Sequence, residues 1–387
     1  MKRTLLTIGL MFSLVASFAC MRKGGDNVND DSGPIKVGVY MDLSGQTAGF
    51  GKSTLNGIEL AAAEINATGG VNGRTIKILP EDDQGRPEQA KTVVSKLISQ
   101  DKVHAVLGEV ASSNSLAAAP VAQENKVPMI TPSSTNPKVT QTGDYIFRVC
   151  FIDPFQGAVM AKFAANTLKA KTAAIFGDVN SDYSKGLTEF FEREFNKLGG
   201  TVIRKETYTQ QDPDFKAQLT NIRAANPDVI YIPGYYGQVG IIAKQARELG
   251  LNKPLLGGDG WDNPELWSLG GEALKDAYIS NHYSVDDPSP AIQKFVSAYK
   301  ARFQGVAPDA LAALGYDAMY VLADAVKRAG TTESAKLRDA IAKTSGFLGV
   351  TGSITLNKDR DSVKPAVVLE LDPAGRKFVY KETIKPE

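Results

Sequence analysis

The fold is decided by the stretch IKVGVYMDLSGQTAGFGKSTLNGIELAAAEIN, which spans residues 35–66. Its first seven residues are mostly apolar and partly β-branched, which is typical of a buried strand. Residues 53–66 then carry apolar side chains at the spacing of one helical face, namely Leu55, Ile58, Ala62 and Ile65. A strand followed closely by a helix is half of a βαβ unit, so the stretch predicts a parallel sheet covered by helices on both faces.

The same alternation continues along the chain in two series. The first series predicts strands at 75–79, 103–108, 127–131 and 145–151, with helices at 87–98 and 114–125. The second series predicts strands at 171–177, 201–208, 228–233 and 254–257, with helices at 182–198, 214–225 and 237–249. Two doubly wound, Rossmann-like sheets therefore follow one another, and the predicted fold class is α/β with two lobes.

The last part of the chain has too few strands for a third sheet. It predicts helices near 289–303, 309–329 and 332–344, then short strands at 351–356, 366–371 and 376–380. These elements must return to the two lobes, which predicts a multi-stranded hinge. We expect an N-terminal lobe from residues 35–151 plus 281–355, and a C-terminal lobe from residues 152–280 plus 356–387. A chain of 387 residues is also too long for one ordinary core.

The composition is that of an ordinary soluble protein without an excess of either charge. Lys plus Arg number 44 and Asp plus Glu number 43, so the formal net charge is +1. Binding to a nucleic-acid backbone needs clustered positive charge, and this balance supplies none. We therefore expect no nucleic-acid partner.

The first residues are typical of an export signal. Residues 1–19 place two basic side chains before an apolar run that is too short to cross a bilayer, which predicts a signal peptide. Cys20 follows Ser17-Phe18-Ala19 and resembles the lipidated cysteine of bacterial lipoproteins, although cleavage after Ala19 by the ordinary peptidase stays open. Residues 20–34, rich in Gly, Asp and Asn, predict a flexible tether. We expect an exported protein in the periplasm or at the cell surface, with the membrane reached only through Cys20.

The residues that catalysis needs are missing from the sequence. It holds no Gly-x-Ser-x-Gly, no His-Glu-x-x-His and no Cys/His cluster, so we expect no enzyme activity, no metal and no cofactor. Residues 45–53 resemble a phosphate-binding loop, but five residues separate Gly45 from Gly51 where that motif needs four. Cys150 and the two histidines, His104 and His282, are expected to be structural.

Polar and aromatic residues instead follow the predicted strands. Ligands of parallel sheets lie outside the carboxyl ends of the strands, so these positions are the candidates. In the first series they carry hydroxyls, at Ser112, Ser133, Ser134 and Thr135, beside helix N-termini that favour a carboxylate. In the second series they carry Tyr183, Tyr235, Tyr236 and Asp259. A carboxylate near a cleft needs a cation, so Asp259 predicts an ammonium partner and the whole set predicts a receptor for an α-amino acid.

Several stretches, in this order and spacing, resemble the type I periplasmic substrate-binding proteins of the leucine/isoleucine/valine class. The stretches are Leu43–Gly51, Gly57–Asn66, Thr131–Pro137, Arg148–Gly157 and Gly234–Tyr236. The resemblance covers essentially Ile35 to Phe378. It implies a Venus-flytrap fold and an amino acid, most simply a branched-chain or other apolar one, delivered to the permease subunits of an ABC transporter. A ligand sensor of the same fold, which would bind an amide, urea or an aromatic compound and serve a signalling partner, stays open.

The resemblance also assigns roles to single residues. It implies that the four hydroxyls hold the ligand carboxylate and that Asp259 pairs with the ammonium. Phe50 stands where the family often has Tyr, so it would contact the ligand through its face. Tyr183 and one of Tyr235 or Tyr236 would close over the ligand. Asp259 replaces the Glu of leucine-type members, which leaves aromatic and polar amino acids open as ligands.

Overall fold

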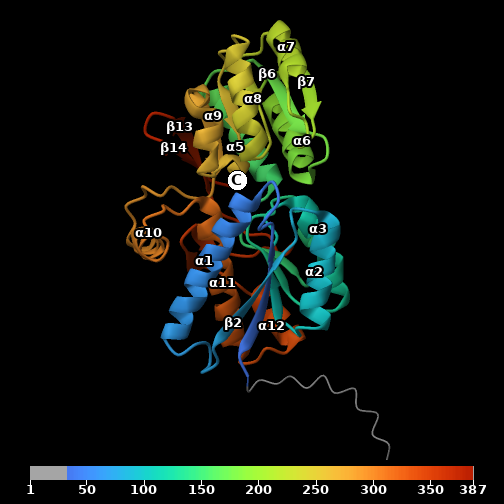
Figure 1. Cartoon of the computed structure of the whole chain (residues 1–387), viewed down its shortest axis with the longest axis vertical. Helices are drawn as coiled ribbons and strands as arrows, with labels where there is room; N and C mark the ends of the chain where they lie inside the picture. Colours follow the sequence, from blue (N-terminus) through green and yellow to red (C-terminus); the bar gives the residue numbers. More distant parts are fainter. Residues whose placement is uncertain (1–32, 387) are drawn as a thin grey trace, which may run out of the picture. The chain divides into compact units, whose positions relative to one another are not determined.

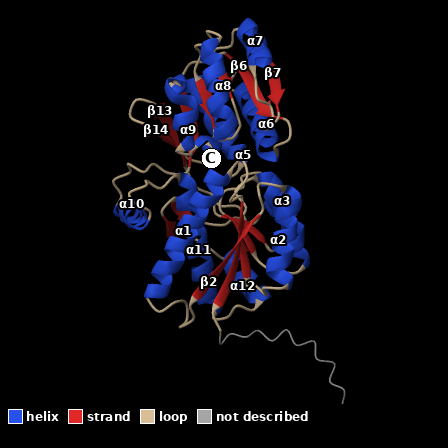
Figure 2. Ribbon diagram, in the orientation of Figure 1, coloured by secondary structure: helices blue, strands red, loops and turns tan. Residues whose placement is uncertain are grey.

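The structure, a computed structural model, describes residues 33–386. The predictions for the signal peptide and for Cys20 lie outside these residues. The described chain is α/β and forms two lobes, each built on a sheet with helices on its faces (Figures 1 and 2). No helix within residues 33–386 combines the length and the apolar character that a membrane span requires.

The first lobe is built on a parallel sheet. Its described strands run in the order β2 (Ile76–Asp82), β1 (Ile35–Met41), β3 (Ala105–Leu107), β4 (Met129–Thr131) and β5 (Ile146–Arg148). Its helices are α1 (Ala48–Ala67), α2 (Pro87–Ser99), α3 (Ser112–Glu124), α4 (Lys138–Gln141), α10 (Pro290–Arg302), α11 (Ala310–Ala329) and α12 (Ser334–Ala342). A small hairpin of β11 (Phe347–Gly349) and β12 (Gly352–Ile354) packs on α11.

The core of this lobe follows the period of two along β1. Val37 and Val39 belong to the cluster that includes Ile58 of α1, whereas Tyr40 belongs to the cluster of α2 and α3, with Leu97. Both faces of the sheet are therefore buried, which explains its nearly continuous apolar strands. Helices α1 and α11 lie side by side over one face (Figure 1).

The second lobe has a mixed sheet. Within residues 33–386 the order is β14 (Lys377–Ile384), β13 (Ala366–Asp372), β10 (Ala277–Asn281), β9 (Leu255–Gly257), β8 (Val229–Tyr231), β6 (Thr172–Asp178) and β7 (Thr201–Tyr208). Strands β6 to β10 pair in parallel, while β13 pairs antiparallel with β10 and with β14. The helical elements are α5 (Asp153–Lys162), η1 (Phe163–Thr167), α6 (Asp182–Lys197), α7 (Lys216–Ala225), α8 (Tyr236–Glu248), η2 (Asp259–Trp261), α9 (Glu265–Gly270) and η3 (Gly271–Leu274).

The described chain crosses between the two sheets in three segments. They are residues 149–152 between β5 and α5, residues 282–289 between β10 and α10, and residues 355–365 between β12 and β13. The crossings make the multi-stranded hinge that the sequence predicts. Strand β10 and helix α5 are absent from the sequence-based prediction, and both lie next to a crossing.

Candidate functional site

A small cavity lies at the carboxyl ends of the strands of both sheets. The free space in it is about 10 Å³, which is room for about one water molecule. We call it the ligand cavity. Its lining consists of Phe50, Val110, Ser133 and Leu311 from the first lobe and Tyr183, Tyr235, Asp259 and Gly260 from the second. Five of the predicted site residues therefore meet at one place, although they come from separate loops.

Asp259 is the only acidic residue of that lining, and three hydrogen bonds fix its carboxylate. Oδ1 accepts from Gln156 Nε2 at 2.7 Å and from the Tyr183 hydroxyl at 2.8 Å. Oδ2 lies 2.9 Å from Nε2 of His282. A carboxylate has about four acceptor positions, so these partners orient Asp259 and leave room for one further donor.

His282 is a neutral partner of Asp259. Its side chain is fully buried, and burial lowers its pKa to about 4 because the imidazolium would lose its water. The neutral ring must then donate through Nε2 to be hydrogen-bonded to Asp259. A neutral ring does not balance the charge of Asp259, which also interacts with the buried Lys364. Sequence reasoning treated His282 as structural and missed this contact, because nothing local links the residue after β10 to the first residue of η2.

The His282 ring also joins two of the crossings. It stacks on Phe151 with 3.8 Å between ring centroids and 17° between planes. Phe151 lies in the first crossing and His282 opens the second. The Asp259 carboxylate is therefore one hydrogen bond away from the hinge.

The predicted site hydroxyls of the first lobe differ in whether they already have a hydrogen-bond partner within the protein. Ser133 Oγ and Thr135 Oγ1 are buried and have no hydrogen-bond partner anywhere in residues 33–386. Ser112 Oγ accepts from the backbone N–H of Asn136 at 3.2 Å, which brings the two hydroxyl clusters together. A buried hydroxyl without a partner costs about 1–3 kcal/mol, so Ser133, which lines the cavity, is suited to a polar ligand, whereas Thr135 lies outside the lining and next to the Asp153 carboxylate.

Ser134 differs from its neighbours because its hydroxyl is already used. Its Oγ donates toward the carbonyl oxygens of Glu109 at 2.8 Å and Val110 at 3.0 Å, and it lies 2.7 Å from Ser115 Oγ. Adjacent residues point in different directions, so a run of hydroxyls in the sequence does not give a run of free hydroxyls. The hydroxyl of Ser134 already has protein partners in this structure, and its contact with a ligand carboxylate stays a prediction.

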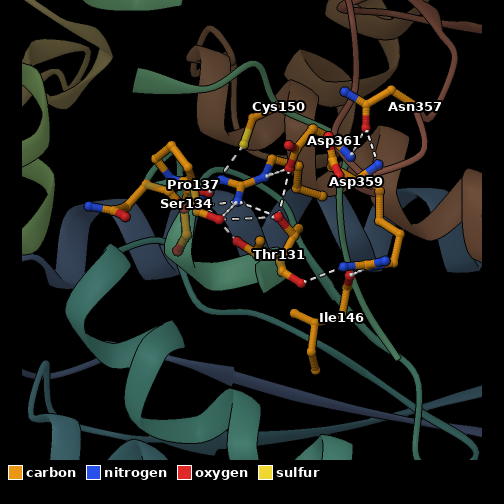
Figure 3. Close-up of polar contacts among 12 residues, drawn as sticks. Thr131, Ser134, Pro137, Ile146, Cys150, Asn357, Asp359 and Asp361 are labelled. Atoms are coloured by element: carbon orange, nitrogen blue, oxygen red, sulfur yellow. Dashed lines mark hydrogen bonds and ion pairs between the residues drawn. The ribbon is translucent and has the colours of Figure 1, made fainter. Parts of the chain in front are cut away.

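The side chain of Arg148 stabilises the loop that carries these hydroxyls by binding its backbone carbonyls. This fully buried side chain donates to the carbonyl oxygens of Ser134 at 2.5 Å and Asn136 at 2.8 Å, and its Nε lies 2.6 Å from Asp361 Oδ1. Figure 3 shows Ser134, Pro137 and Asp361 around this network. Asp361 belongs to the third crossing, so the loop and the hinge share one ion pair. A lone Arg in the apolar stretch 145–151 is the signal that could have revealed it.

Aromatic rings from both lobes close the cavity. The ring of Tyr183 stacks on that of Tyr235, with 5.2 Å between centroids and 11° between planes. Phe50 of α1 meets Tyr235 and Tyr236 edge to face, at 5.8 Å and 4.8 Å. Tyr236 is not in the lining; its hydroxyl accepts from Gly49 N–H at 3.3 Å and donates to the Gln46 carbonyl at 3.4 Å. Tyr235 therefore covers the cavity, and Tyr236 joins the lobes beside it.

Asp153, the first residue of α5, is fully buried, with Thr135 and Arg148 as its nearest favourable neighbours. Neither carboxylate oxygen has a hydrogen-bond partner in the part of the chain that the structure describes. Burial raises its pKa to about 8, because water no longer solvates the charged form.

We expect this carboxyl to make the protein less stable as the pH rises. A folded pKa above the ordinary value of 3.8 means that its stabilising contribution is present below about pH 4 and is lost as the pH rises to about 8. Asp153→Asn removes the titration. The variant should gain at least about 1 kcal/mol relative to the wild type between pH 5 and pH 9, in urea unfolding. Parallel pH profiles of the two proteins would contradict the assignment.

Two other side chains that can be reactive, Cys150 and His104, lie outside the ligand cavity. Cys150 is fully buried, and burial raises the pKa of its thiol to about 12. His104 Nδ1 accepts from the backbone N–H of Lys36 at 2.9 Å. No group of three or more His, Cys, Asp or Glu side chains within residues 33–386 has an arrangement that could hold a metal ion.

Two α/β lobes, three crossings and a small cavity with one oriented carboxylate define a two-lobed ligand-binding protein of the periplasmic type. The chain belongs to the periplasmic binding protein family, whose sequence model matches residues 34–376. The family is one of binding proteins that serve transporters, not of enzymes.

Relatives of this chain include proteins with described ligands. A Leu/Ile/Val-binding protein homologue of Brucella melitensis is 30% identical over 86% of this chain and 89% of its own length. The leucine-binding protein LivK of Thermotoga maritima is 42% identical, with a TM-score of 0.87 over 91% of this chain and 99% of the other. LivJ, a branched-chain amino acid transporter substrate-binding protein of Streptococcus pneumoniae solved with isoleucine, is 34% identical, with a TM-score of 0.86 over 91% and 100%.

Proposed function

We propose that this chain captures an amino acid with an apolar, branched side chain in the ligand cavity and delivers it to an ABC transporter. The observation that carries the proposal is the Asp259 carboxylate, which has a neutral histidine behind it and shares the cavity with the unbonded hydroxyl of Ser133. An α-amino acid has an ammonium and a carboxylate next to each other, and these two partners complement them. The names of the relatives, which specify leucine, isoleucine and valine, support the same class.

In this proposal the first lobe binds the ligand carboxylate. Ser133 and Thr135 donate their free hydroxyls, and Ser112 adds its proton from the first residue of α3. The backbone N–H groups at the start of α3, a helix of 13 residues, favour a negative charge at the same place. Ser134 contributes through its backbone position only, since its hydroxyl is engaged.

The remaining wall of the cavity suits an apolar side chain. The first lobe contributes apolar side chains to the wall, from Phe50, Val110 and Leu311. The second lobe contributes the rings of Tyr183 and Tyr235. Burial of a leucine-sized side chain there contributes roughly 1.5–3 kcal/mol. The charged ends of the ligand therefore supply most of the selection for an amino acid, and the wall selects its size.

Delivery follows from closure of the lobes. The ligand docks on the hydroxyls of the first lobe, and Tyr183, Tyr235 and Asp259 then close on it by bending of the three crossings. We propose that the permease subunits of the transporter recognise the closed form.

A signal peptide over residues 1–19 and lipidation of Cys20 would place the protein at the membrane where the permease lies. Incorporation of a labelled fatty acid into the wild type, but not into Cys20→Ser, is the result expected of such an anchor.

Leucine analogues test the two charged contacts separately. By calorimetry, we expect the purified protein to bind leucine, isoleucine or valine, and to bind 4-methylpentanoate, which lacks the ammonium, roughly 100-fold more weakly than leucine. Leucinamide, which lacks the carboxylate, should lose affinity to a similar degree. Equal affinity for leucine and 4-methylpentanoate would contradict the pairing of Asp259 with the ligand ammonium. If the protein bound no amino acid, the proposed function would be overturned.

A further inference from the structure

A second, larger cavity lies beside the ligand cavity and shares Tyr235 with it. It has a volume of about 460 Å³, which falls in the range of small-molecule sites. Ala111 of the larger cavity directly follows Val110 of the ligand cavity. We call the larger cavity the vestibule. Its lining comes from the loops after β1, β2 and β3 of the first sheet and after β6, β7 and β8 of the second.

Six of the seventeen residues that line the vestibule carry a side-chain amide, and three are charged: Asp42, Arg86 and Glu88. The amides are Gln46, Gln84, Asn114, Asn180, Gln210 and Gln211. Among the charged residues of the lining, Asp42 already accepts from the N–H groups of Gly45 and Thr47, and an Nη group of Arg86 donates to Gln84 Oε1 at 2.5 Å. Amides offer both donors and acceptors without charge, so this surface complements a neutral, hydrogen-bonding group.

One amide of this lining has an unused donor. Asn114 is only 2% exposed, and its Nδ2 has no hydrogen-bond partner in the described part of the chain. It stands in the first turn of α3, two residues after Ser112. An unpaired buried donor costs about 1–3 kcal/mol, so a ligand acceptor that reaches Asn114 would remove that cost.

We propose that the vestibule receives the distal end of a ligand longer than leucine, namely an α-amino acid whose side chain ends in an amide, from glutamine to γ-glutamyl amides. The inference rests on the proposed function, because the α-ammonium and α-carboxylate must occupy the ligand cavity for the side chain to pass Tyr235. It extends the ligand class from apolar amino acids to neutral amides. The carbonyl oxygen of the ligand amide accepts from Asn114 Nδ2.

Calorimetry with leucine and L-γ-glutamylethylamide tests this inference. We expect the wild type to bind both, and Asn114→Ala to weaken the amide at least 10-fold more than it weakens leucine. Alanine is a good helix residue, so α3 should persist. Asn125→Ala at the other end of α3 is the matched control and should weaken both ligands equally, if at all. In the wild type, Nδ2 of Asn125 donates to the carbonyl oxygen of Val121.

The outcomes separate the inference from the proposed function. Binding of leucine without binding of the amide would overturn the inference and leave the function standing. An Asn114→Ala variant that weakens both ligands by the same factor would also overturn it, because Asn114 would then act on the whole cleft. Failure to bind any amino acid would overturn the proposed function itself.

Discussion

Asp259→Asn is expected to abolish most of the affinity for amino acids while leaving the fold intact. Asparagine keeps an oxygen that can accept from Tyr183, so the local structure should persist. The ligand ammonium, however, would be buried without a counter-charge. Removing one member of a buried charge pair costs about 2–5 kcal/mol, which corresponds to a loss of roughly 30- to 4,000-fold in affinity.

Calorimetry with leucine measures this loss, and thermal unfolding followed by circular dichroism checks the fold. Asp276→Asn is a suitable control, because Asp276 is an exposed acid of the same lobe outside the cavity lining. Asparagine also tolerates its positive φ of 58°. An affinity within threefold of the wild type for Asp259→Asn would rule out the ammonium contact.

Asp361→Asn is expected to produce the largest loss of stability, about 3–5 kcal/mol. The substitution leaves the guanidinium of Arg148 fully buried without its anion. Because Arg148 also holds the Ser134 and Asn136 carbonyls, we expect the affinity for leucine to fall as well. Urea unfolding measures the first effect and calorimetry the second.

Two further variants separate the ion pair from other effects. Asp359→Asn changes the charge of the same crossing and should alter the free energy of unfolding by less than about 0.5 kcal/mol. The double change Arg148→Met with Asp361→Leu removes both charges and should recover much of the stability. A double variant no more stable than Asp361→Asn would mean that the ion pair is not the source of the loss.

Local patterns explain why the sequence predicts the two sheets. The alternation of Val37 and Val39 with Tyr40, and the helical spacing around Ile58, reflect burial that each segment imposes by itself. Strand β10 gives a weaker signal, because Ser280 and Asn281 are polar and yet fully buried between β9 and β13. Its identity depends on strands that are distant in sequence.

In the candidate site, too, the sequence predicts what local position determines and misses what depends on contacts between distant segments. The rule that ligands lie at the carboxyl ends of parallel strands was enough to select Ser133, Tyr183 and Asp259, which the structure places around one cavity. Their role as ligand contacts stays a prediction. The rule could not reveal His282 behind Asp259, since that contact depends on how a crossing packs.

The packing of α1 against α11 has a consequence for the order of folding. At Gly57 of α1, a methyl group would lie 1.9 Å from the carbonyl oxygen of Ala312, so the two helices meet backbone to backbone. This contact joins residues that are far apart in sequence, and such contacts form slowly. The lobe that ribosomes begin first cannot complete its core until residue 354 has been synthesised, because α12 and β12 also contribute to it. For a chain that we propose to be exported, this delay keeps the nascent protein unfolded, as passage through a translocation channel requires.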